Sequence, residues 1–251
     1  MNFTIITINL NNADGLEKTI LSVLSQTYKK IQHIIIDGRS QDKSQNIIEK
    51  YSSYGVYGIS ESDKGIYDAM NKGISNITSD EGYTLFLNSG DTFNDSNVLN
   101  KLNSYIIQNC ITSDVFLYGD HIYKRKNQRK HIVGKNIKYI LKGMPFSHQS
   151  IFLPNHFMKR NKYSLIYSIA GDYDYFIRAW KKKSIFEYVP IIISDVEGGG
   201  ISDINRIKGI RERMYSLKNH GLLTRKLKGW YVLRIIRTYI TEYLKETLKN
   251  L

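Results

Sequence analysis

The first hundred residues alternate short apolar runs with segments whose apolar residues recur at helical intervals. The apolar runs are rich in β-branched residues and end at polar ones, which predicts buried strands at residues 3–8, 31–36, 56–60 and 83–87. Helical spacing predicts helices near residues 14–24, 47–51 and 67–74. Asp14 stands before the first of these helices and Glu17 follows three residues later, a spacing that is typical of a capping box.

Alternating strands and helices predict an α/β fold with a Rossmann-like, mostly parallel sheet and helices on both faces. Crossovers between parallel strands are right-handed. In such sheets, ligands bind beyond the carboxyl ends of the strands. The polar residues at those ends are Thr7, Asn9, Asp37, Glu61, Asp63 and Asp91. We therefore expect these side chains to face a common crevice.

The pattern is weaker in the second half of the chain. Residues 114–118 and 150–153 are predicted strands, and residues 124–130 form a charged loop or hairpin tip. A helix is expected over residues 172–180, with Asp172 near its start. The chain shows no internal repeat or low-complexity linker. We expect one catalytic domain over residues 1–204 and a helical tail over residues 205–251.

The composition is that of a folded protein, with 41% hydrophobic and 24% charged residues. Cys110 is the only cysteine, so the chain cannot form an internal disulfide, and nothing indicates an oxidising compartment. The amino terminus does not resemble a signal peptide, and no apolar run is long enough for a transmembrane helix. These features favour a cytoplasmic location.

The formal net charge of +13 is concentrated in the tail, where residues 205–251 hold 12 Lys or Arg and 3 Asp or Glu. Part of this basic character is of the kind that an A·T-rich genome produces. Within the tail, basic residues flank an apolar stripe that is formed by Leu223, Leu227, Trp230, Leu233 and Ile236. Such a stripe fits an interfacial helix on the inner face of an anionic membrane. It fits equally a helix packed on the catalytic domain or on a second subunit.

Several acidic residues follow strands or begin helices. Asp91 ends the sequence NSGD after a predicted strand, and Asp172 begins a predicted helix. One such residue alone is more often a turn former or a helix cap. Asp91 and Asp172, together with Asp37 and Asp63, suit the transfer of a sugar from a nucleotide. This reaction requires a cation on the diphosphate and a carboxylate that acts as a base.

These motifs resemble the family 2 inverting glycosyltransferases with the GT-A fold, over about the first 200 residues. The similarity is greatest to short bacterial enzymes of lipopolysaccharide, capsule and exopolysaccharide synthesis. Its most specific part is SESDKGIYDAMNKG at residues 60–73. The supporting segments are residues 7–9, 36–42, 86–91, 146–150, 172–178 and 198–202.

The resemblance implies a nucleotide-binding half over about residues 1–95 and an acceptor half over about residues 96–204. It implies a nucleoside-diphosphate sugar donor, usually with UDP, and a saccharide or lipid-linked acceptor. Asp172 would be the catalytic base, and Asp91 would bind Mn²⁺ or Mg²⁺. The implied donor-binding residues are Thr7, Asn9, Asp37, Asp63, Lys64, Asp68, Asn71, Asn88, Ser89 and Gly90. The implied acceptor or donor contacts are His148, Gln149, Gly199 and Gly200.

Four features leave alternatives open. The metal motif has one carboxylate, Asp91, where the wider family has two. Gly171 replaces the Glu of the usual Glu-Asp base motif, and Asp174 competes with Asp172 as the base. Lys64 would contact phosphate or solvent, and His148 would be a site residue or a structural histidine.

Other functions fit the sequence less well. A nucleic-acid-binding protein would gather basic and aromatic residues on one surface, whereas the strand ends here gather Asp and Asn. A nucleotidyltransferase would carry a glycine-rich basic loop after the first strand. A binding domain without catalysis would not need both Asp91 and Asp172. The sequence leaves a homo-oligomer open.

Overall fold

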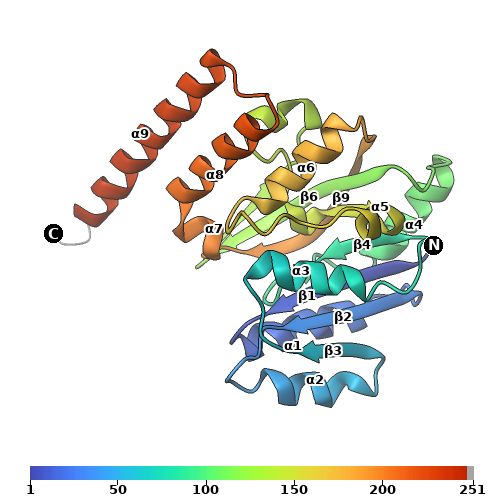
Figure 1. Cartoon of the computed structure of the whole chain (residues 1–251). Helices are drawn as coiled ribbons and strands as arrows, with labels where there is room; N and C mark the ends of the chain where they lie inside the picture. Colours follow the sequence, from blue (N-terminus) through green and yellow to red (C-terminus); the bar gives the residue numbers. More distant parts are fainter. Residues whose placement is uncertain (248–251) are drawn as a thin grey trace.

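The computed structural model describes residues 1–247, and a nine-stranded sheet forms its centre (Figure 1). One half of the sheet is parallel, in the order β3-β2-β1-β4. The bounds of these strands are Phe3–Asn9 for β1, Ile31–Asp37 for β2, Val56–Ser60 for β3 and Tyr83–Phe86 for β4. This half confirms the four strands that the apolar runs predict.

The other half of the sheet is mixed. Its strands are β5 (Thr92–Phe93), β6 (Phe116–Arg125), β7 (Gln128–Ile132), β8 (Ile151–Pro154) and β9 (Phe186–Glu197). β8 lies antiparallel between β4 and β6, and β9 runs parallel to β6. β6 and β7 form the hairpin that is one of the two structures predicted for residues 124–130. The parallel character therefore belongs mainly to the first half.

Helices cover both faces of the sheet, as predicted (Figure 1). Their bounds are Ala13–Leu24 for α1, Ser44–Ser52 for α2, Ile66–Ser75 for α3, Val98–Gln108 for α4, Asn155–Arg160 for α5, Gly171–Lys181 for α6, Ile201–Ile204 for α7, Arg206–Asn219 for α8 and Arg225–Thr247 for α9. Short 3₁₀ helices cover Ile137–Lys142 (η1) and His148–Ser150 (η2). α3 and α6 pack on one face of the sheet, and α1, α2 and α4 pack on the other.

The predicted capping box of the first helix is wrong. α1 begins at Ala13, and the Asn12 side chain accepts a hydrogen bond from the backbone N–H of Gly15 at 3.2 Å. Asp14 therefore lies inside the first turn. Glu17 does not reach back to the cap, because its carboxylate binds Lys50 and the Tyr51 hydroxyl on α2. Asn and Asp are both favourable N-cap residues, so residue type alone does not distinguish Asn12 from Asp14 as the cap. The tertiary contacts of Glu17 and Asn12 decide where α1 begins.

The apolar stripe of the tail divides into a packed part and an exposed part. Leu223, Leu227 and Trp230 pack against the main core, and Tyr231 is fully buried in it. Beyond them, the exposed fraction is 68% for Leu233, 49% for Ile236, 54% for Ile240 and 70% for Tyr243. These four residues follow helical spacing, and we call them the exposed apolar face of α9.

The boundary predicted between residues 204 and 205 does not coincide with a gap in the packing. Ile210 and Leu217 of α8 belong to the same core cluster as Phe176 of α6. The last turns of α9 project away from this core (Figure 1). Within residues 1–247, no helix has the length and apolar character that are needed to cross a membrane.

Candidate active site

Three predicted donor-binding residues lie beneath the surface at the carboxyl ends of β1 and β2. Asn9 stands beside Asp37 in the parallel register, and its amide donates to the Asp37 carboxylate at 2.7 Å. Asp37 also accepts from the backbone N–H of Ser40 and from the Ser60 hydroxyl, and it has no exposed surface. Thr7 is fully buried and hydrogen-bonded to His33. These contacts fix the loops around the crevice, and direct contact of these residues with a donor stays a prediction.

The loop before α3 lies next to the loop that follows β2. Asp63 accepts a hydrogen bond from the Gly65 N–H at 2.8 Å, and a Cβ atom built on Gly38 would lie 2.7 Å from its carboxylate. Asp68 accepts from the Lys64 N–H at 2.9 Å, which fixes the first turn of α3. The Lys64 side chain is exposed. Asp63 is thus partly exposed and Lys64 exposed, beside the loop that follows β2.

Two predicted residues have structural partners elsewhere. The amide of Asn71 donates to the Tyr163 carbonyl at 2.9 Å and accepts from the Tyr163 N–H at 2.8 Å. Glu61, which was expected to face the crevice, forms an ion pair with Lys72 at 2.9 Å. The resemblance implied a donor contact for Asn71, whereas in the structure Asn71 ties α3 to the segment before α6.

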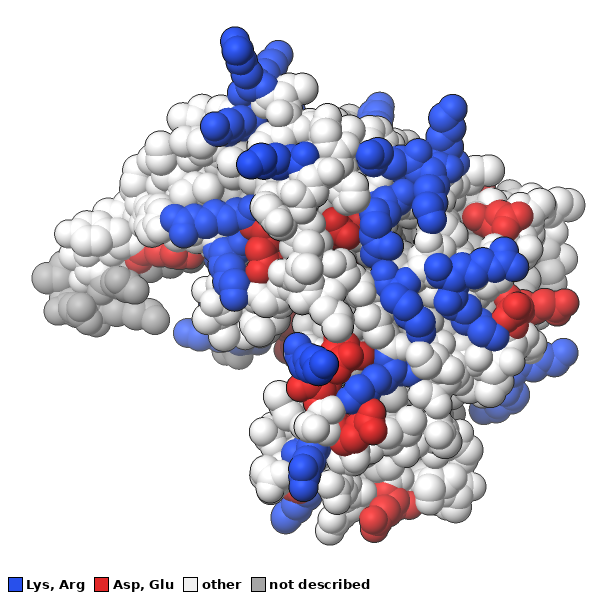
Figure 2. Space-filling view, in the orientation of Figure 1, with Lys and Arg blue, Asp and Glu red and all other residues white. Residues whose placement is uncertain are grey.

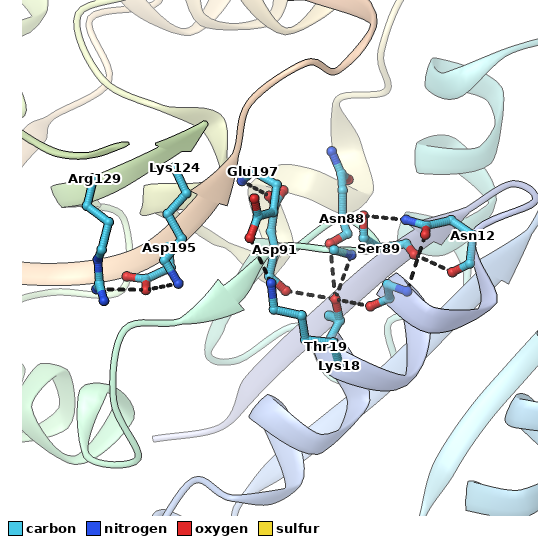
Figure 3. A network of polar contacts seen from close by, with 12 residues as sticks. Asn12, Lys18, Thr19, Asn88, Ser89, Asp91, Lys124, Arg129, Asp195 and Glu197 are labelled. Carbon is cyan, nitrogen blue, oxygen red and sulfur yellow. Dashed lines mark hydrogen bonds and ion pairs between the residues drawn. The ribbon is translucent and has the colours of Figure 1, made fainter. Parts of the chain in front are cut away.

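The turn at residues 88–91 is fixed against the start of α1 (Figure 3). The Thr19 hydroxyl donates to the Asp91 carbonyl at 2.7 Å and accepts from the Gly90 N–H at 3.0 Å. Ser89 donates to the Asn12 carbonyl at 3.1 Å. Gly90 has φ +100°, a conformation that suits glycine. The sequence analysis did not predict a role for Thr19 or Asn12. A polar Thr within the apolar stripe of a helix does, however, indicate a hydrogen-bonding role.

Asp91 is almost enclosed, with 5% of its surface exposed. Its carboxylate accepts from the backbone N–H of Glu197 at 2.9 Å and from the Gln149 amide at 3.1 Å. Burial is the main cause that raises the pKa of Asp91 to about 7. The Glu197 side chain pairs with Lys18 at 2.7 Å beside this site (Figure 3). Gln149 is therefore a direct partner of Asp91.

The protein side chains do not form a metal site by themselves. Over residues 1–247, no group of three or more His, Cys, Asp or Glu side chains is arranged to hold a metal ion. Both carboxylate oxygens of Asp91 already accept hydrogen bonds. A hard cation needs about six oxygen ligands, so a cation here would depend on ligands that the protein does not supply.

Asp172 lies at the start of α6, where it meets residues from two other elements. Its carboxylate lies 3.4 Å from the Tyr67 hydroxyl of α3 and 3.6 Å from Nδ1 of His148. The other ring nitrogen of His148 lies 3.2 Å from the amide nitrogen of Asn88. His148 therefore connects Asp172 to the turn that carries Asp91. Burial lowers the pKa of His148 while Asp172 opposes this shift, and the net lowering favours the neutral ring.

Asn88 contributes an unused acceptor to this group. Its side-chain oxygen is buried and lacks a hydrogen-bond partner within the described part of the chain. A buried acceptor without a partner costs free energy, and a bound ligand with a hydroxyl or N–H group relieves that cost. This oxygen is therefore available to accept a hydrogen bond from a ligand, and such binding stays a prediction.

The structure explains the glycine of the base motif. A Cβ atom built on Gly171 would lie 2.7 Å from the ring of Tyr67, which is closer than real contacts allow. Tyr67 in turn donates a hydrogen bond to the Ile169 carbonyl at 2.8 Å. The close approach of Tyr67 to the backbone at the start of α6 thus excludes a side chain at position 171.

Asp174, the competing base, belongs to a buried network. Its carboxylate lies 3.1 Å from Arg178, 2.9 Å from the Ser216 hydroxyl and 2.9 Å from the ring of His220. Only 3% of its surface is exposed. These contacts join α6 to α8, and they support Asp172 as the base.

Gly199 and Gly200 follow β9, which ends at Glu197, and Gly198 stands between. Gly199 has φ +97°, and its N–H donates to the Asp203 carboxylate at 2.8 Å. The Glu197 N–H binds Asp91, which places the start of this glycine run beside the turn at residues 88–91. Contact of Gly199 and Gly200 with a ligand stays a prediction.

Glu212 of α8 is a site residue that the sequence analysis missed. Its carboxylate accepts hydrogen bonds from the backbone N–H groups of Ser168, Ile169 and Ala170, at 2.8–3.2 Å. These residues immediately precede Gly171 and Asp172. A carboxylate at a helix start satisfies N–H groups that have no partner within the helix. The distance in sequence between Glu212 and α6 hides this contact.

We expect Glu212→Ala to lower the turnover number by about tenfold and to lower the melting temperature. Its loss frees the segment that positions Asp172, without touching the donor side of the crevice. Donor affinity, measured by calorimetry, should stay within about twofold of wild type. Glu49→Gln, which changes an exposed carboxylate on α2, is the control. Unchanged turnover in Glu212→Ala would show that these bonds do not position the base.

Solved structures share this fold. S. aureus TarS 1-349 in complex with UDP superposes with a TM-score of 0.67 at 15% identity, covering 87% of this chain and 66% of that one. Mannosyltransferase PcManGT from Pyrobaculum calidifontis, in complex with GDP-Man and Mn²⁺, gives 0.66 at 11% identity, covering 89% and 65%. This chain thus spans about two thirds of each. The likeness confirms the GT-A fold.

Sequence relatives place the chain in a family. The model "Glycosyl transferase family 2" matches residues 4–178. An uncharacterized glycosyltransferase of Mycobacterium tuberculosis (strain CDC 1551 / Oshkosh) is 31% identical over 179 residues, which cover 70% of this chain and 68% of that protein. A PGL/p-HBAD biosynthesis glycosyltransferase of Mycobacterium bovis (strain BCG / Pasteur 1173P2) is 28% identical over 207 residues, covering 80% and 79%. The chain belongs to glycosyltransferase family 2 and is a glycosyltransferase.

Proposed function

We propose that this enzyme transfers a hexose or N-acetylhexosamine, with inversion, from a nucleoside-diphosphate sugar to a saccharide or lipid-linked saccharide. The acceptor belongs to the assembly of surface polysaccharide or glycolipid, as the resemblance and the mycobacterial relative suggest. UDP is the first candidate for the nucleotide, because TarS was solved with UDP and UDP-GlcNAc, and GDP is the second, because PcManGT was solved with GDP-Man.

The observation that carries this proposal is the group formed by Asp172, His148 and Asn88. It joins the start of α6 to the turn at the end of β4, where the reacting sugar has to lie between base and leaving group. In the proposed reaction, Asp172 takes the proton of the acceptor hydroxyl. The hydroxyl oxygen attacks the anomeric carbon from the face opposite the diphosphate, and the bond from that carbon to the diphosphate oxygen breaks.

The leaving diphosphate keeps the electron pair of the broken bond. The ring of His148 lies between Asp172 and Asn88, where it is proposed to orient both side chains toward the sugar. Asp63 and Lys64 are proposed to contact the nucleotide from the loop before α3. Asp91, together with the diphosphate of the donor, would hold a divalent cation, and the cation would neutralise charge on the leaving group.

The test is a panel of UDP, GDP and dTDP sugars with Mn²⁺, read by thermal stabilisation and by release of nucleoside diphosphate. One donor should raise the melting temperature, because a ligand that binds the folded state stabilises it by mass action. The corresponding nucleoside monophosphates serve as controls. If no sugar nucleotide stabilises or turns over better than these monophosphates, the proposal fails.

We also propose that the exposed apolar face of α9 rests on the membrane that carries the acceptor. The face presents four large apolar side chains, and the tail around it is basic. Lys and Arg also dominate the upper part of the view in Figure 2, where Figure 1 places α6, α8 and the start of α9. Anionic lipid attracts such a surface, and apolar side chains insert at the interface.

A further inference from the structure

A cavity of about 750 Å³ lies between the segment of residues 135–145 and the two tail helices. Neither Asp91 nor Asp172 lines it. Four cationic side chains line it, namely Lys135, Lys142, Arg213 and Arg234. The other lining residues within the described chain are Tyr139, Gly143, Met144 and Pro145, so no acidic residue lines it.

The two arginines converge on one point of this cavity. A Cβ atom built on Gly143 would lie 3.2 Å from Nη1 of Arg234 and 3.6 Å from Nη1 of Arg213. Gly143 has φ +132°, which favours glycine, and its lack of a side chain leaves room beside both guanidinium groups. Two like charges so close together repel each other. Burial, followed by the charge of Arg213, lowers the pKa of Arg234.

Within the described residues, none of the four cations forms an ion pair. Nε of Arg213 is buried and has no hydrogen-bond partner there. Arg234 donates to one backbone carbonyl, that of Lys142, at 2.9 Å. Partly buried cations without a counter-charge are costly, and a bound anion offsets that cost. The cavity therefore has the charge and the unused donors of an anion-binding site.

The donor set favours a phosphate. Guanidinium groups present paired N–H donors that match phosphate oxygens, and lysines add flexible point charges. With two residues of each kind and no carboxylate, the cavity suits an anion of more than one charge. Phosphate and diphosphate groups fit these donors better than a single carboxylate does.

The cavity borders the element that carries the base. The guanidinium of Arg213 lies 5.9 Å from the ring centre of Tyr173, which follows Asp172 in the first turn of α6. The Tyr231 hydroxyl of α9 lies 3.4 Å from that of Tyr173. Arg234 directly follows Leu233, the first residue of the exposed apolar face. A phosphate in the cavity would thus lie between the base helix and the helix that we propose to contact the membrane.

We propose that this cavity binds a phosphate or diphosphate group, the one that links the acceptor saccharide to its carrier. The identity of this ligand rests on the proposed glycosyl transfer, whereas anion binding by the cavity does not. The group is part of a lipid headgroup or of a soluble sugar phosphate, and both present the same oxygens to Arg213 and Arg234.

The first experiment measures binding of inorganic pyrophosphate by calorimetry in EDTA, which prevents cation-bridged binding in the donor crevice. The double variant Arg213→Gln/Arg234→Gln should bind at least about tenfold more weakly than wild type. Arg237→Gln removes an exposed charge from the same helix outside the cavity, and it should bind like wild type. Equal affinity of wild type and the double variant would overturn the proposal.

A second pair of variants guards against misfolding, because Arg234 also binds the Lys142 carbonyl. Lys135 and Lys142 are exposed, so Lys135→Gln/Lys142→Gln should fold normally. It should still weaken pyrophosphate binding severalfold, and unchanged binding would count against the site. Donor hydrolysis should persist in all of these variants. Loss of pyrophosphate binding with retained hydrolysis separates this inference from the proposed function, which is tested by the panel of donors.

The third arm identifies the source of the phosphate. Phosphatidylcholine vesicles with and without a polyprenyl diphosphate are floated with wild type and with the double variant. Recruitment that requires the polyprenyl diphosphate and the two arginines assigns the site to a lipid headgroup. Pyrophosphate binding without such recruitment assigns it to a soluble sugar phosphate. Recruitment of the double variant equal to that of wild type overturns a role for the cavity in lipid binding.

Discussion

The Asp172→Asn variant is expected to turn over about 10²- to 10⁴-fold more slowly than wild type, the range that a positioned general base contributes. Asn keeps the size of the side chain and its contact with the Tyr173 N–H, which lies 2.7 Å from the carboxylate. It cannot accept the acceptor proton. Steady-state transfer with the donor identified by the panel measures the loss, and calorimetry should give a donor affinity within about twofold of wild type.

Asp174→Asn is the matched control, two positions along the same helix. Its carboxylate is enclosed by Arg178, Ser216 and His220, so its loss should lower the melting temperature. Asp172→Asn should melt near the wild-type temperature. Near-normal turnover in Asp172→Asn, with a large loss in a folded Asp174→Asn, would transfer the role of base to Asp174.

The second large effect concerns Asp91. With Mn²⁺ present, Asp91→Asn should weaken donor binding at least about tenfold, the lower end of the losses that follow disruption of a metal site. In EDTA the two proteins should bind the donor equally. Isothermal calorimetry in both buffers gives the comparison. Equal loss of affinity in both buffers would mean that Asp91 shapes the crevice without contacting a cation.

Asp91 also makes a pH-dependent contribution to stability. Burial raises its folded pKa to about 7, so the folded protein holds this proton more tightly than the unfolded chain does. The side chain therefore costs stability as the pH rises from about 4 to about 7, by up to about 4 kcal/mol. Asp91→Asn lacks this cost. We measure the free energy of unfolding by denaturant titration in EDTA. The value for the variant, relative to that for wild type, should increase from about pH 4 to about pH 7. A difference that does not change with pH would contradict a buried carboxyl with a raised pKa.

The sequence sufficed for the parallel half of the fold because its strands are continuous apolar runs. Strands buried on both faces leave this signature, and the three isoleucines at residues 34–36 show it. The mixed half is harder to predict. β8 follows η2, yet it lies between β4 and β6, and nothing in its four residues specifies antiparallel pairing with either neighbour.

The candidate site was predictable where a motif specified the residue type, and less so where contacts decide the role. The resemblance names Asp172, His148 and Asn88, and in the structure His148 lies between the other two. The amide of Asn71, by contrast, binds the backbone of Tyr163, a partner that periodicity along α3 does not reveal. The role of Glu212 could not be predicted, because its hydrogen-bond partners lie more than 40 positions away in the sequence. Which face of α9 packs on the core depends in the same way on tertiary contacts.

The hydrogen bonds from Glu212 to the segment before α6 have a practical consequence for protein engineering. The family model ends at residue 178, yet the residue that holds this segment stands beyond that limit. A chimera of two relatives whose junction lies between α6 and α8 takes residues 168–170 from one relative and the residue at position 212 from the other. Such a chimera can lose the hydrogen bonds that Glu212 makes to this segment. Exchanging α6 and α8 as one block preserves the geometry of Asp172, and we recommend that junctions be placed before residue 168.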